Sequence, residues 1–372
     1  MSLLALRWRK LKAILRRRGV RYAFHFSWYY VLLKITDRFS TSRKLFFWWP
    51  PFPQHLEIEV TTRCNLRCLM CEHTYWAEPS RDMSFDSFCS IVEQFPTLRW
   101  LGLTGIGESF LHPEYMKMLE WAKERLITIE ISDPLHFVTA VQVERMVQIG
   151  VDRLFISMDA ATRKTYEQIR RGARFDRVLE NIRLLFEKKH EEGNRVPEIF
   201  FHFVICKRNI HEILDFIELV HGLRRGQKAT IQFSKLLHRF PEIDDLYVEV
   251  RQDDMEKANE MAARLGVHVI WNRSMTDRKP SMRECLAWIE PFIFVTGDVV
   301  PCCAGNEANR RTWQRENRLG NVFEKPFSRI WRGERYRDLR KRLREGGTPA
   351  SCSYCTVYAL QGQDEPCRRK KP

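Results

Sequence analysis

The sequence predicts an α/β protein in which parallel strands curve into a partial barrel, with a basic helical arm before it and a small cysteine-rich domain after it. Two patterns predict the barrel: six strand-like segments alternate with helical segments, and their spacing is short and regular. The third observation is that six of the eleven cysteines lie in the last quarter of the chain. We therefore expect the arm at 1–50, the barrel at 51–240, a connecting helix and strand at 241–280, and the cysteine-rich domain at 281–372.

The expected arm carries most of the positive charge of the chain. The formal net charge is +15, and residues 1–50 contain twelve Lys or Arg and one acid, Asp37. Residues 368–371 are all basic, so residues 51–367 carry no net charge. Leucines at helical spacing and a following aromatic run favour contact between the arm and an anionic membrane surface, rather than nucleic acid. A helix packed on the barrel is the alternative.

Two absences in the sequence guide the expected location. No apolar run approaches the ~20 residues of a membrane-spanning helix, and no signal peptide opens the chain. Clustered cysteines in a chain of 372 residues are typical of an intracellular metal protein, and not of a secreted disulfide framework. We expect a cytoplasmic protein with peripheral contact to the inner face of the membrane.

The expected elements follow one another as βα units. A proline-rich stretch at 48–53 separates the arm from the barrel. The six expected strands span residues 56–60, 100–104, 128–131, 153–157, 199–204 and 230–233. The expected helices span residues 85–95, 113–125, 141–149, 175–191 and 209–221. A helix at 253–265 and a strand at 267–270 lead to the cysteine-rich quarter, which we expect to be held by metal rather than by a hydrophobic core.

Three cysteines, Cys64, Cys68 and Cys71, fall within eight residues directly after the first expected strand. Active sites of βα barrels lie where strands end, so this loop is a candidate site. Three thiolates in one loop can hold three irons of a four-iron cluster and leave the fourth iron open to a ligand. Zinc is the alternative, but a structural zinc site takes four N or S ligands, and His73 is the available fourth. The spacing favours the cluster.

This Cys-x3-Cys-x2-Cys loop resembles that of the radical S-adenosylmethionine (radical SAM) superfamily, and the resemblance covers about residues 55–235. It implies a partial (β/α)6 barrel and a catalytic [4Fe-4S] cluster on Cys64, Cys68 and Cys71, whose open iron binds S-adenosylmethionine (SAM). It also implies that reductive cleavage of SAM yields a 5′-deoxyadenosyl radical, which abstracts hydrogen from a substrate C–H bond. The cofactors supply the reactivity, and the protein orients them and excludes water.

The segment that ends the second strand resembles the Gly-Gly-Glu motif of the family, which binds the amino group of SAM. Here Gly105, Gly107 and Glu108 match the motif, and Ile106 separates the two glycines. Glycines allow the backbone to approach a ligand closely, and a carboxylate can accept hydrogen bonds from an ammonium group. The position one strand after the cysteine loop favours a ligand site over an ordinary turn.

Two later segments are similar to the remaining SAM-binding motifs. Ser157 and Asp159 end the fourth strand and resemble the Ser-x-Asp segment that contacts the ribose. Arg170 is the expected partner of the SAM carboxylate, although an exposed helix arginine is the alternative. The backbone at 204–205 is expected to meet the adenine.

The end of the third strand departs from the family pattern. Asp133 and His136 stand where many relatives carry Thr-Asn-Gly. An acid and a histidine at the barrel mouth could move substrate protons. The favoured alternative is a turn before Pro134, in which Asp133 hydrogen-bonds the local backbone.

The C-terminal cysteines resemble those of the auxiliary-cluster domains called SPASM and its shortened form, twitch. The resemblance implies a second [4Fe-4S] cluster with four thiolate ligands, Cys285, Cys302, Cys352 and Cys355. Cys303 is the alternative to Cys302, and Cys302 is preferred because it keeps the Gly-x4-Cys spacing from Gly297. Only Cys367 follows, which favours a single auxiliary cluster. Cys89 and Cys206 are expected to be buried thiols.

We therefore expect a radical SAM enzyme that oxidises or rearranges its substrate and takes electrons from a flavodoxin or ferredoxin. The basic arm favours a substrate at the membrane, such as a lipid or lipid-linked sugar, and any other small molecule stays open. A peptide maturase is the alternative enzyme. A metal-stabilised binding protein without catalysis is the alternative from another class, and it would have no need of the SAM-binding residues.

Overall fold

The computed structural model describes most of the barrel and of the cysteine-rich quarter. The described residues are 15, 20, 24, 45–193, 195–237, 241–272, 275, 279–303 and 311–360. The predicted basic arm before residue 45 lies outside them except for three single residues, and Cys367 lies outside them as well. No helix in these ranges is long and apolar enough to cross a bilayer.

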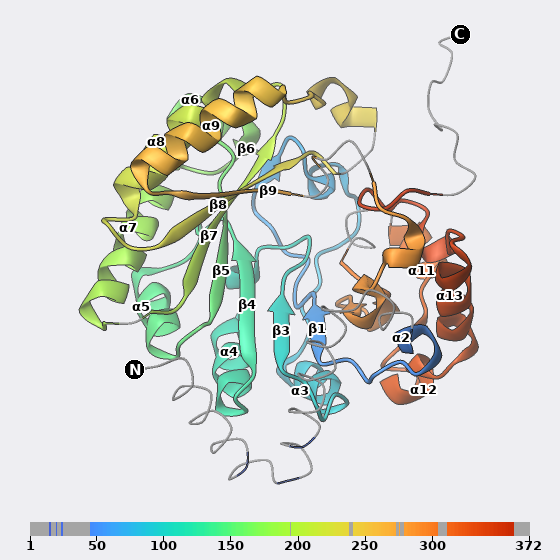
Figure 1. The fold of residues 1–372 in the computed structure, drawn as a ribbon. Coiled ribbons are helices and arrows are strands. Elements are labelled where there is room, and N and C mark those ends of the chain that lie inside the picture. The colour runs from blue at the N-terminus through green and yellow to red at the C-terminus, as the bar shows by residue number, and fades with distance from the viewer. Residues whose placement is uncertain are drawn as a thin grey trace.

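One curved sheet runs through the molecule (Figure 1). Among the described residues it has ten strands, in the order β12-β11-β10-β1-β3-β4-β5-β7-β8-β9. The pairs from β10-β1 to β8-β9 are parallel, which confirms the predicted α/β class. The barrel strands are β1 (His55–Ile58), β3 (Trp100–Leu103), β4 (Thr128–Asp133), β5 (Arg153–Ser157), β7 (Glu198–Ile205), β8 (Ala229–Lys235) and β9 (His268–Trp271). The first six correspond to the predicted strands, and β9 continues the sheet beyond β8.

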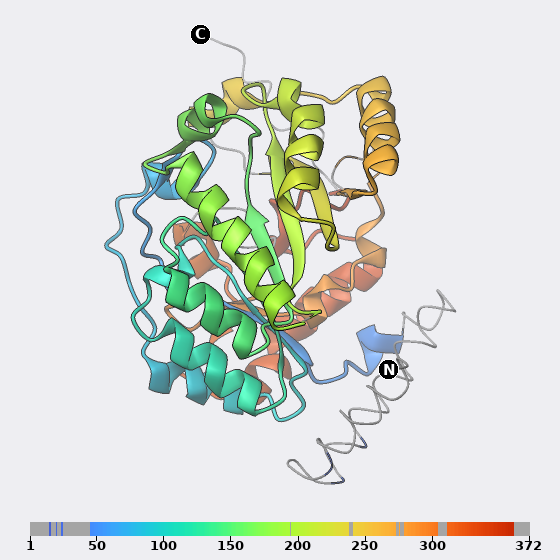
Figure 2. The ribbon, with the colours of Figure 1, turned by 90° about the vertical axis from the view of Figure 1, so that its left-hand side faces the viewer.

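Helices cover the outer face of the barrel sheet, as Figure 2 shows. They are α3 (Phe85–Glu93), α4 (Tyr115–Glu124), α5 (Ala140–Gln148), α6 (Arg163–Ile169), α7 (Phe175–Glu191), α8 (Ile213–Leu223) and α9 (Gln252–Leu265). Alternation of burial along β7 explains this layering, because one side chain in two is fully buried against the helices. Helix α5 begins at a capping box, in which Thr139 and Gln142 satisfy each other's backbone N–H groups.

The cysteine-rich quarter extends the same sheet past β1. Strand β10 (Phe292–Ile293) lies parallel to β1, and β11 (Asp298–Val300) and β12 (Gly320–Asn321) follow antiparallel. Its helices are α11 (Arg311–Glu316), α12 (Phe327–Trp331) and α13 (Glu334–Glu345). Helix α2 (Leu45–Trp48) packs beside α13 (Figure 1). Short 3-10 turns complete the fold: η2 (Glu72–Tyr75), η3 (Ser109–Leu111), η4 (Ile210–Glu212), η5 (Pro241–Leu246), η7 (Met282–Glu284), η8 (Ala287–Ile289) and η9 (Ala350–Cys352).

The prediction that metal alone holds this quarter together is wrong. Trp288, Trp331, Tyr336 and Leu339 are buried and belong to the same apolar cluster as the barrel core. The rings of Trp288 and Trp331 stack with centroids 5.6 Å apart. The C-terminal quarter therefore shares one continuous hydrophobic core with the barrel.

Candidate active site

The three-cysteine loop leaves β1 and is held against a distant part of the chain. Its two-residue strand β2 (Arg67–Cys68) pairs antiparallel with β6 (Arg170–Arg171), and Cys68 stands opposite Arg170. The Leu69 N–H donates to the Ile169 carbonyl at 2.8 Å, and the Thr74 hydroxyl donates to the Cys68 carbonyl at 2.6 Å. These bonds fix the loop and bring Cys68 and Arg170, two predicted site residues, side by side.

The thiols of Cys64, Cys68 and Cys71 are half-buried and lie within electrostatic reach of one another. Burial raises the pKa of Cys64 and of Cys68 to about 12, so a thiolate here needs a cationic partner. Iron of a cluster supplies that partner, and the donor set fits a [4Fe-4S] cluster bound by three cysteines.

His73 does not complete a zinc site in this structure. Its Nε2 atom lies 2.9 Å from the Thr62 carbonyl oxygen, and its Nδ1 atom lies 3.4 Å from the Arg67 guanidinium. Both ring nitrogens are therefore engaged. Within the described ranges, no three His, Cys, Asp or Glu side chains gather closely enough to bind one metal ion. Thiolates on a four-iron cluster need not converge in this way, because each binds a different iron.

The glycines of the predicted Gly-Gly-Glu motif bring two loops into contact. A Cβ atom on Gly107 would lie 2.4 Å from the Thr61 carbonyl oxygen, and one on Gly105 would lie 2.5 Å from Cγ of Glu59. The Glu108 N–H donates to the Arg63 carbonyl at 2.8 Å. The loop after β3 therefore packs directly on the cysteine loop, and this contact requires glycine whether or not a ligand is bound.

Glu108 is a buried carboxyl group with unused hydrogen-bonding capacity. It is 2% exposed; Oε1 accepts a long bond of 3.4 Å from the Phe137 N–H, and Oε2 has no partner among the described residues. Burial and the neighbouring charge of Asp133 raise the pKa of Glu108. An ammonium group would satisfy both the free oxygen and the buried charge, so Glu108 fits the amino group of SAM.

The turn predicted at the end of the third expected strand, which is β4, is present. Asp133 Oδ1 accepts the Leu135 N–H at 2.7 Å, as in an Asx turn, and Leu135 adopts a positive φ of 58°. The Asn181 side chain donates to the Leu135 carbonyl at 2.8 Å and to the Val138 carbonyl at 3.0 Å, which holds the strained turn in place. His136 is buried, and neither of its ring nitrogens has a partner in the part of the chain that the structure describes.

Asp159 and Arg170 form a buried ion pair at 2.5 Å. Asp159 Oδ1 also accepts the Val204 N–H at 2.8 Å, so both of its carboxylate oxygens are engaged. Arg170 keeps one buried donor, Nε, for which the described residues offer no acceptor. That free donor fits an anionic group such as the SAM carboxylate. Ser157 is half-buried at the end of β5, beside His202 on β7.

Two residues that the sequence reasoning missed hold this wall of the site. The Asn209 side chain donates to the Asp159 and Val204 carbonyls, both at 2.8 Å. The buried Glu212 carboxylate accepts the N–H groups of Ala161 and Thr162 at 2.7 and 3.1 Å. Both residues lie between β7 and α8, and the available signal was an amide and an acid placed just after a strand end.

The four predicted auxiliary ligands come together from three segments. Cys285 follows η7, Cys302 lies two residues after β11, and Cys352 and Cys355 lie at and just after the end of η9. Burial, together with the charges of the neighbouring thiolates, raises the pKa of Cys302. Cys303 is exposed, and of the two predicted buried thiols Cys206 is buried and Cys89 half-buried. The set fits a [4Fe-4S] cluster with four thiolate ligands.

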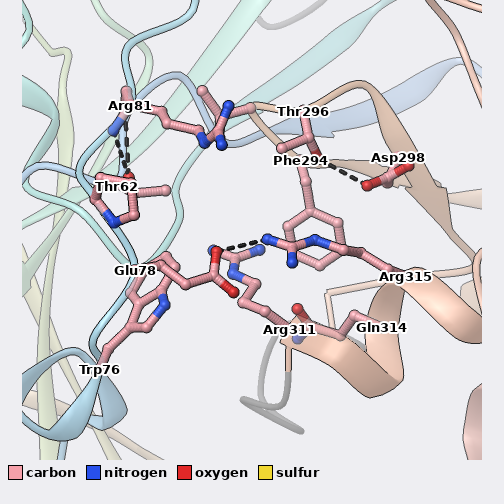
Figure 3. A pocket seen from close by; sticks show the side chains of 12 residues that line it. Thr62, Trp76, Glu78, Arg81, Phe294, Thr296, Asp298, Arg311, Gln314 and Arg315 are labelled. Atoms are coloured by element: carbon pink, nitrogen blue, oxygen red, sulfur yellow. Dashed lines mark hydrogen bonds and ion pairs between the residues drawn. The ribbon is translucent and has the colours of Figure 1, made fainter.

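A narrow pocket marks the seam between the cysteine loop and the C-terminal quarter (Figure 3). Arg311 crosses the seam to pair with the fully buried Glu59, and its guanidinium lies 4.4 Å from the Phe294 ring centroid. Arg315 pairs with Glu78 at 2.5 Å. The cavity volume is about 10 Å³, so it holds at most a water molecule, and ion pairs close the seam.

Two protein families match the chain. Residues 58–220 match the radical SAM superfamily, and residues 285–356 match the SPASM iron-sulfur cluster-binding domain.

Several curated proteins are similar in sequence. The tungsten-containing aldehyde ferredoxin oxidoreductase cofactor-modifying protein of Pyrococcus furiosus is 28% identical over 326 residues, which is 82% of this chain and 87% of that protein. The AdoMet-dependent heme synthase of Methanosarcina barkeri is 23% identical over 339 residues, with 82% and 90% covered. The GTP 3′,8-cyclase of Listeria welshimeri is 30% identical over 173 residues, with 44% and 49% covered.

Solved structures share the fold. Streptococcus suis SuiB bound to S-adenosylmethionine superposes with a TM-score of 0.63 at 14% identity, covering 94% of this chain and 86% of that one. The anSMEcpe structure with bound AdoMet gives a TM-score of 0.59 at 14% identity, with 82% and 88% covered.

Proposed function

This chain is a radical SAM protein with a SPASM domain, and on that premise we propose that it is an enzyme that cleaves SAM reductively and removes a hydrogen atom from a C–H bond of a small organic molecule. Its expected cofactors, a catalytic [4Fe-4S] cluster, SAM and an auxiliary cluster, agree with both family matches. The reduced cluster and SAM supply a 5′-deoxyadenosyl radical, and the chain's own residues bind and orient these groups.

One observation carries the proposal: the β2–β6 ladder sets Cys68 opposite Arg170, with buried Glu108 nearby. One position is therefore surrounded by three kinds of group. Cys68 offers a thiolate for the cluster, Arg170 a donor for a carboxylate, and Glu108 an acceptor for an ammonium group. SAM presents an α-amino and an α-carboxylate group that need such partners. Glu108 would bind the amino group and Arg170 the carboxylate, each through its unpartnered atom in the described structure.

The remaining SAM-site residues divide between contact and support. We assign Ser157 to the ribose, because it is half-buried at the end of β5. Asp159 already binds Arg170 and the Val204 N–H, so its role is to position Arg170 rather than to bind the ribose itself. Asn209 holds the Asp159 backbone in turn. Together these groups orient SAM over the cysteine loop and keep water from the polar contacts.

The substrate we propose is a small molecule, with a lipid or a lipid-linked sugar favoured by the basic N-terminal arm. Support comes from the two relatives that align with 82% of the chain, whose names describe modification of a cofactor and synthesis of heme. A flavodoxin or ferredoxin would supply the electron. The auxiliary cluster on the C-terminal thiols supplies a second redox centre, so oxidation of the substrate is the favoured outcome over rearrangement.

The test is formation of 5′-deoxyadenosine by anaerobically reconstituted protein given SAM and dithionite. We expect the wild type to form it and Cys68→Ala not to. A matched control is Cys89→Ala, which removes a half-buried thiol outside both predicted ligand sets and should leave product formation intact. Formation by the Cys68 variant at the wild-type rate would exclude the proposed cluster ligand.

Deuterium transfer identifies the substrate class. Candidate lipids, lipid-linked sugars and peptides carrying deuterium are offered in turn, and the molecule that passes deuterium to 5′-deoxyadenosine is the one that loses hydrogen. Transfer from a peptide alone would replace the small-molecule proposal with peptide maturation, the alternative that the sequence left open.

A further inference from the structure

The last residue of helix α2, Trp48, and the residue after it, Trp49, present two tryptophans to solvent, while the two phenylalanines of the helix are buried. Phe46 and Phe47 are buried, and the Phe47 ring lies 5.6 Å from that of Trp288. Trp48 is 61% exposed and Trp49 is 75% exposed. Side chains this large and this exposed are uncommon on a surface that only faces water, so the pair marks a contact site.

A basic stripe on α13 lies next to these tryptophans. Arg337, Lys341 and Arg344 recur at i, i+4 and i+7, and therefore share one side of the helix. The Arg344 guanidinium lies 3.9 Å from the centroid of the Trp48 ring, which joins the stripe to α2. Helices α2 and α13 are side by side in Figure 1. We call Trp48, Trp49, Arg337, Lys341 and Arg344 the Trp–Arg face.

The charge of this face is not neutralised locally. In the described ranges, no carboxylate forms an ion pair with Arg337 or Lys341. The nearby Asp338 is already paired with Arg342 at 2.8 Å. The first 44 residues, which carry twelve Lys or Arg and one acid, join the described chain at Leu45, the first residue of α2. The most basic segment of the chain is therefore attached at the edge of the Trp–Arg face.

We propose that the Trp–Arg face docks on an anionic membrane surface. Basic side chains bind anionic headgroups at about 1 kcal/mol each, and indole rings favour the boundary between headgroups and acyl chains. The basic stripe would contact the anionic headgroups, and the two exposed indoles beside it would lie at the boundary between headgroups and acyl chains. An acidic protein would use the charge but gives no comparable reason for the paired tryptophans, whereas single-stranded nucleic acid, whose bases stack on aromatic rings, is the alternative that an RNA probe tests.

The docking face would hold the C-terminal quarter against the bilayer while the barrel helices α7 and α9 face away (Figure 1). This inference does not rest on SAM cleavage, since none of its residues belongs to the proposed SAM or cluster sites. The two proposals can therefore fail separately.

The test is co-sedimentation of the full chain with vesicles. Wild type should bind phosphatidylcholine vesicles that contain phosphatidylglycerol and should not bind phosphatidylcholine alone. Removing two basic side chains in Arg337→Gln/Lys341→Gln should weaken binding about thirtyfold, from about 1 kcal/mol for each charge. Trp49→Ala should weaken it as well.

A matched control removes the same charge elsewhere: Arg183→Gln/Lys257→Gln changes exposed residues of α7 and α9 and should bind as the wild type does. All variants should show the circular dichroism spectrum and unfolding midpoint of the wild type, which shows that they fold. Equal vesicle binding by wild type and the Arg337/Lys341 variant would overturn the proposal. Single-stranded RNA serves as a parallel probe. If the Arg337→Gln/Lys341→Gln variant lost binding to this RNA but still bound vesicles as the wild type does, the face would bind nucleic acid and the proposal would be wrong.

Discussion

Arg170 shows how one side chain can be both fixed and available. Its ion pair with Asp159 neutralises the buried charge, and pairing with Cys68 across the β2–β6 ladder sets its backbone. The guanidinium has five donors in a fixed plane, so one carboxylate leaves others for a ligand. The buried Nε atom is such a donor, without an acceptor within the described structure.

We expect Arg170→Lys to weaken SAM binding about tenfold to a hundredfold, because a charged hydrogen bond contributes about 1.5–3 kcal/mol and lysine keeps the charge without the planar fork. Equilibrium dialysis of the anaerobic reconstituted protein measures the dissociation constant, and iron content shows whether the cluster persists. Arg171→Lys is the matched control, since Arg171 is the exposed neighbour in the same strand. Equal SAM affinity in both variants would remove Arg170 from the site.

At the scale of elements, the sequence predicts single strands and helices well, but it does not predict which distant segments pair with each other. Strand β5 and helix α7 have the bounds expected from periodicity, because alternation and helical spacing are local signals. The β2–β6 ladder joins residues about a hundred positions apart through two-residue strands, which carry no periodic signal. Helix α6 is short and α13 highly charged, so neither was predicted.

The same distinction applies to the candidate site. Motif spacing selected the cysteines, Glu108 and Arg170 as candidate site residues, because their chemistry is tied to residue type. It did not identify Asn209 or Glu212, whose role depends on which backbone groups the fold brings to them. It also assigned Asp159 to the SAM ribose, a contact that the structure does not test. Both carboxylate oxygens of Asp159 are bonded, one to Arg170 and one to the Val204 N–H, which is why we propose that Asp159 positions Arg170 instead.

The close packing of the glycine loop on the cysteine loop leads to a stability prediction. Gly107→Ala would place a Cβ atom 2.4 Å from the Thr61 carbonyl oxygen, so the loops must separate. We expect a loss of about 1–3 kcal/mol in unfolding free energy and reduced iron incorporation. Gly222→Ala in α8 meets nothing within 4 Å, and should stabilise the helix slightly. Denaturant unfolding of both variants measures the difference, and similar values would show that the loops have room.

Helix α7 carries a titratable group with a marked effect on stability. Lys189 is buried and donates to the Pro197 carbonyl at 2.5 Å, and burial lowers its pKa from 10.5 to about 8. Between those values the unfolded chain binds more protons than the folded one, so the folded state gains stability as pH rises. The gain should reach about 3 kcal/mol. Lys189→Met should lack it, and the difference between the two unfolding curves from pH 7 to 11 isolates it from other groups.

At the scale of the whole molecule, β1 is the junction of two sequence regions. The barrel strands pair with one edge of it and β10 pairs with the other, so one sheet serves both. Just after β1, Glu59 accepts the Ile106 N–H at 3.2 Å from the glycine loop and the Val295 N–H at 3.4 Å from the C-terminal quarter. A single carboxylate thus hydrogen-bonds to both the glycine loop of the barrel and the C-terminal quarter, and it fixes the position of one relative to the other.

Glu59 and Arg311 therefore determine whether the two regions unfold together. Glu59→Gln leaves the buried Arg311 guanidinium without its counter-ion, and breaking a buried pair costs about 3–5 kcal/mol. We expect a lower unfolding midpoint and separate transitions for the barrel and the C-terminal quarter, seen as two steps when denaturant unfolding is followed by circular dichroism. Replacing both partners, in Glu59→Gln/Arg311→Met, should restore part of the loss, because no unpaired charge then remains buried. A single transition in the Glu59 variant at the wild-type midpoint would mean that the shared sheet and core, rather than this ion pair, couple the two regions.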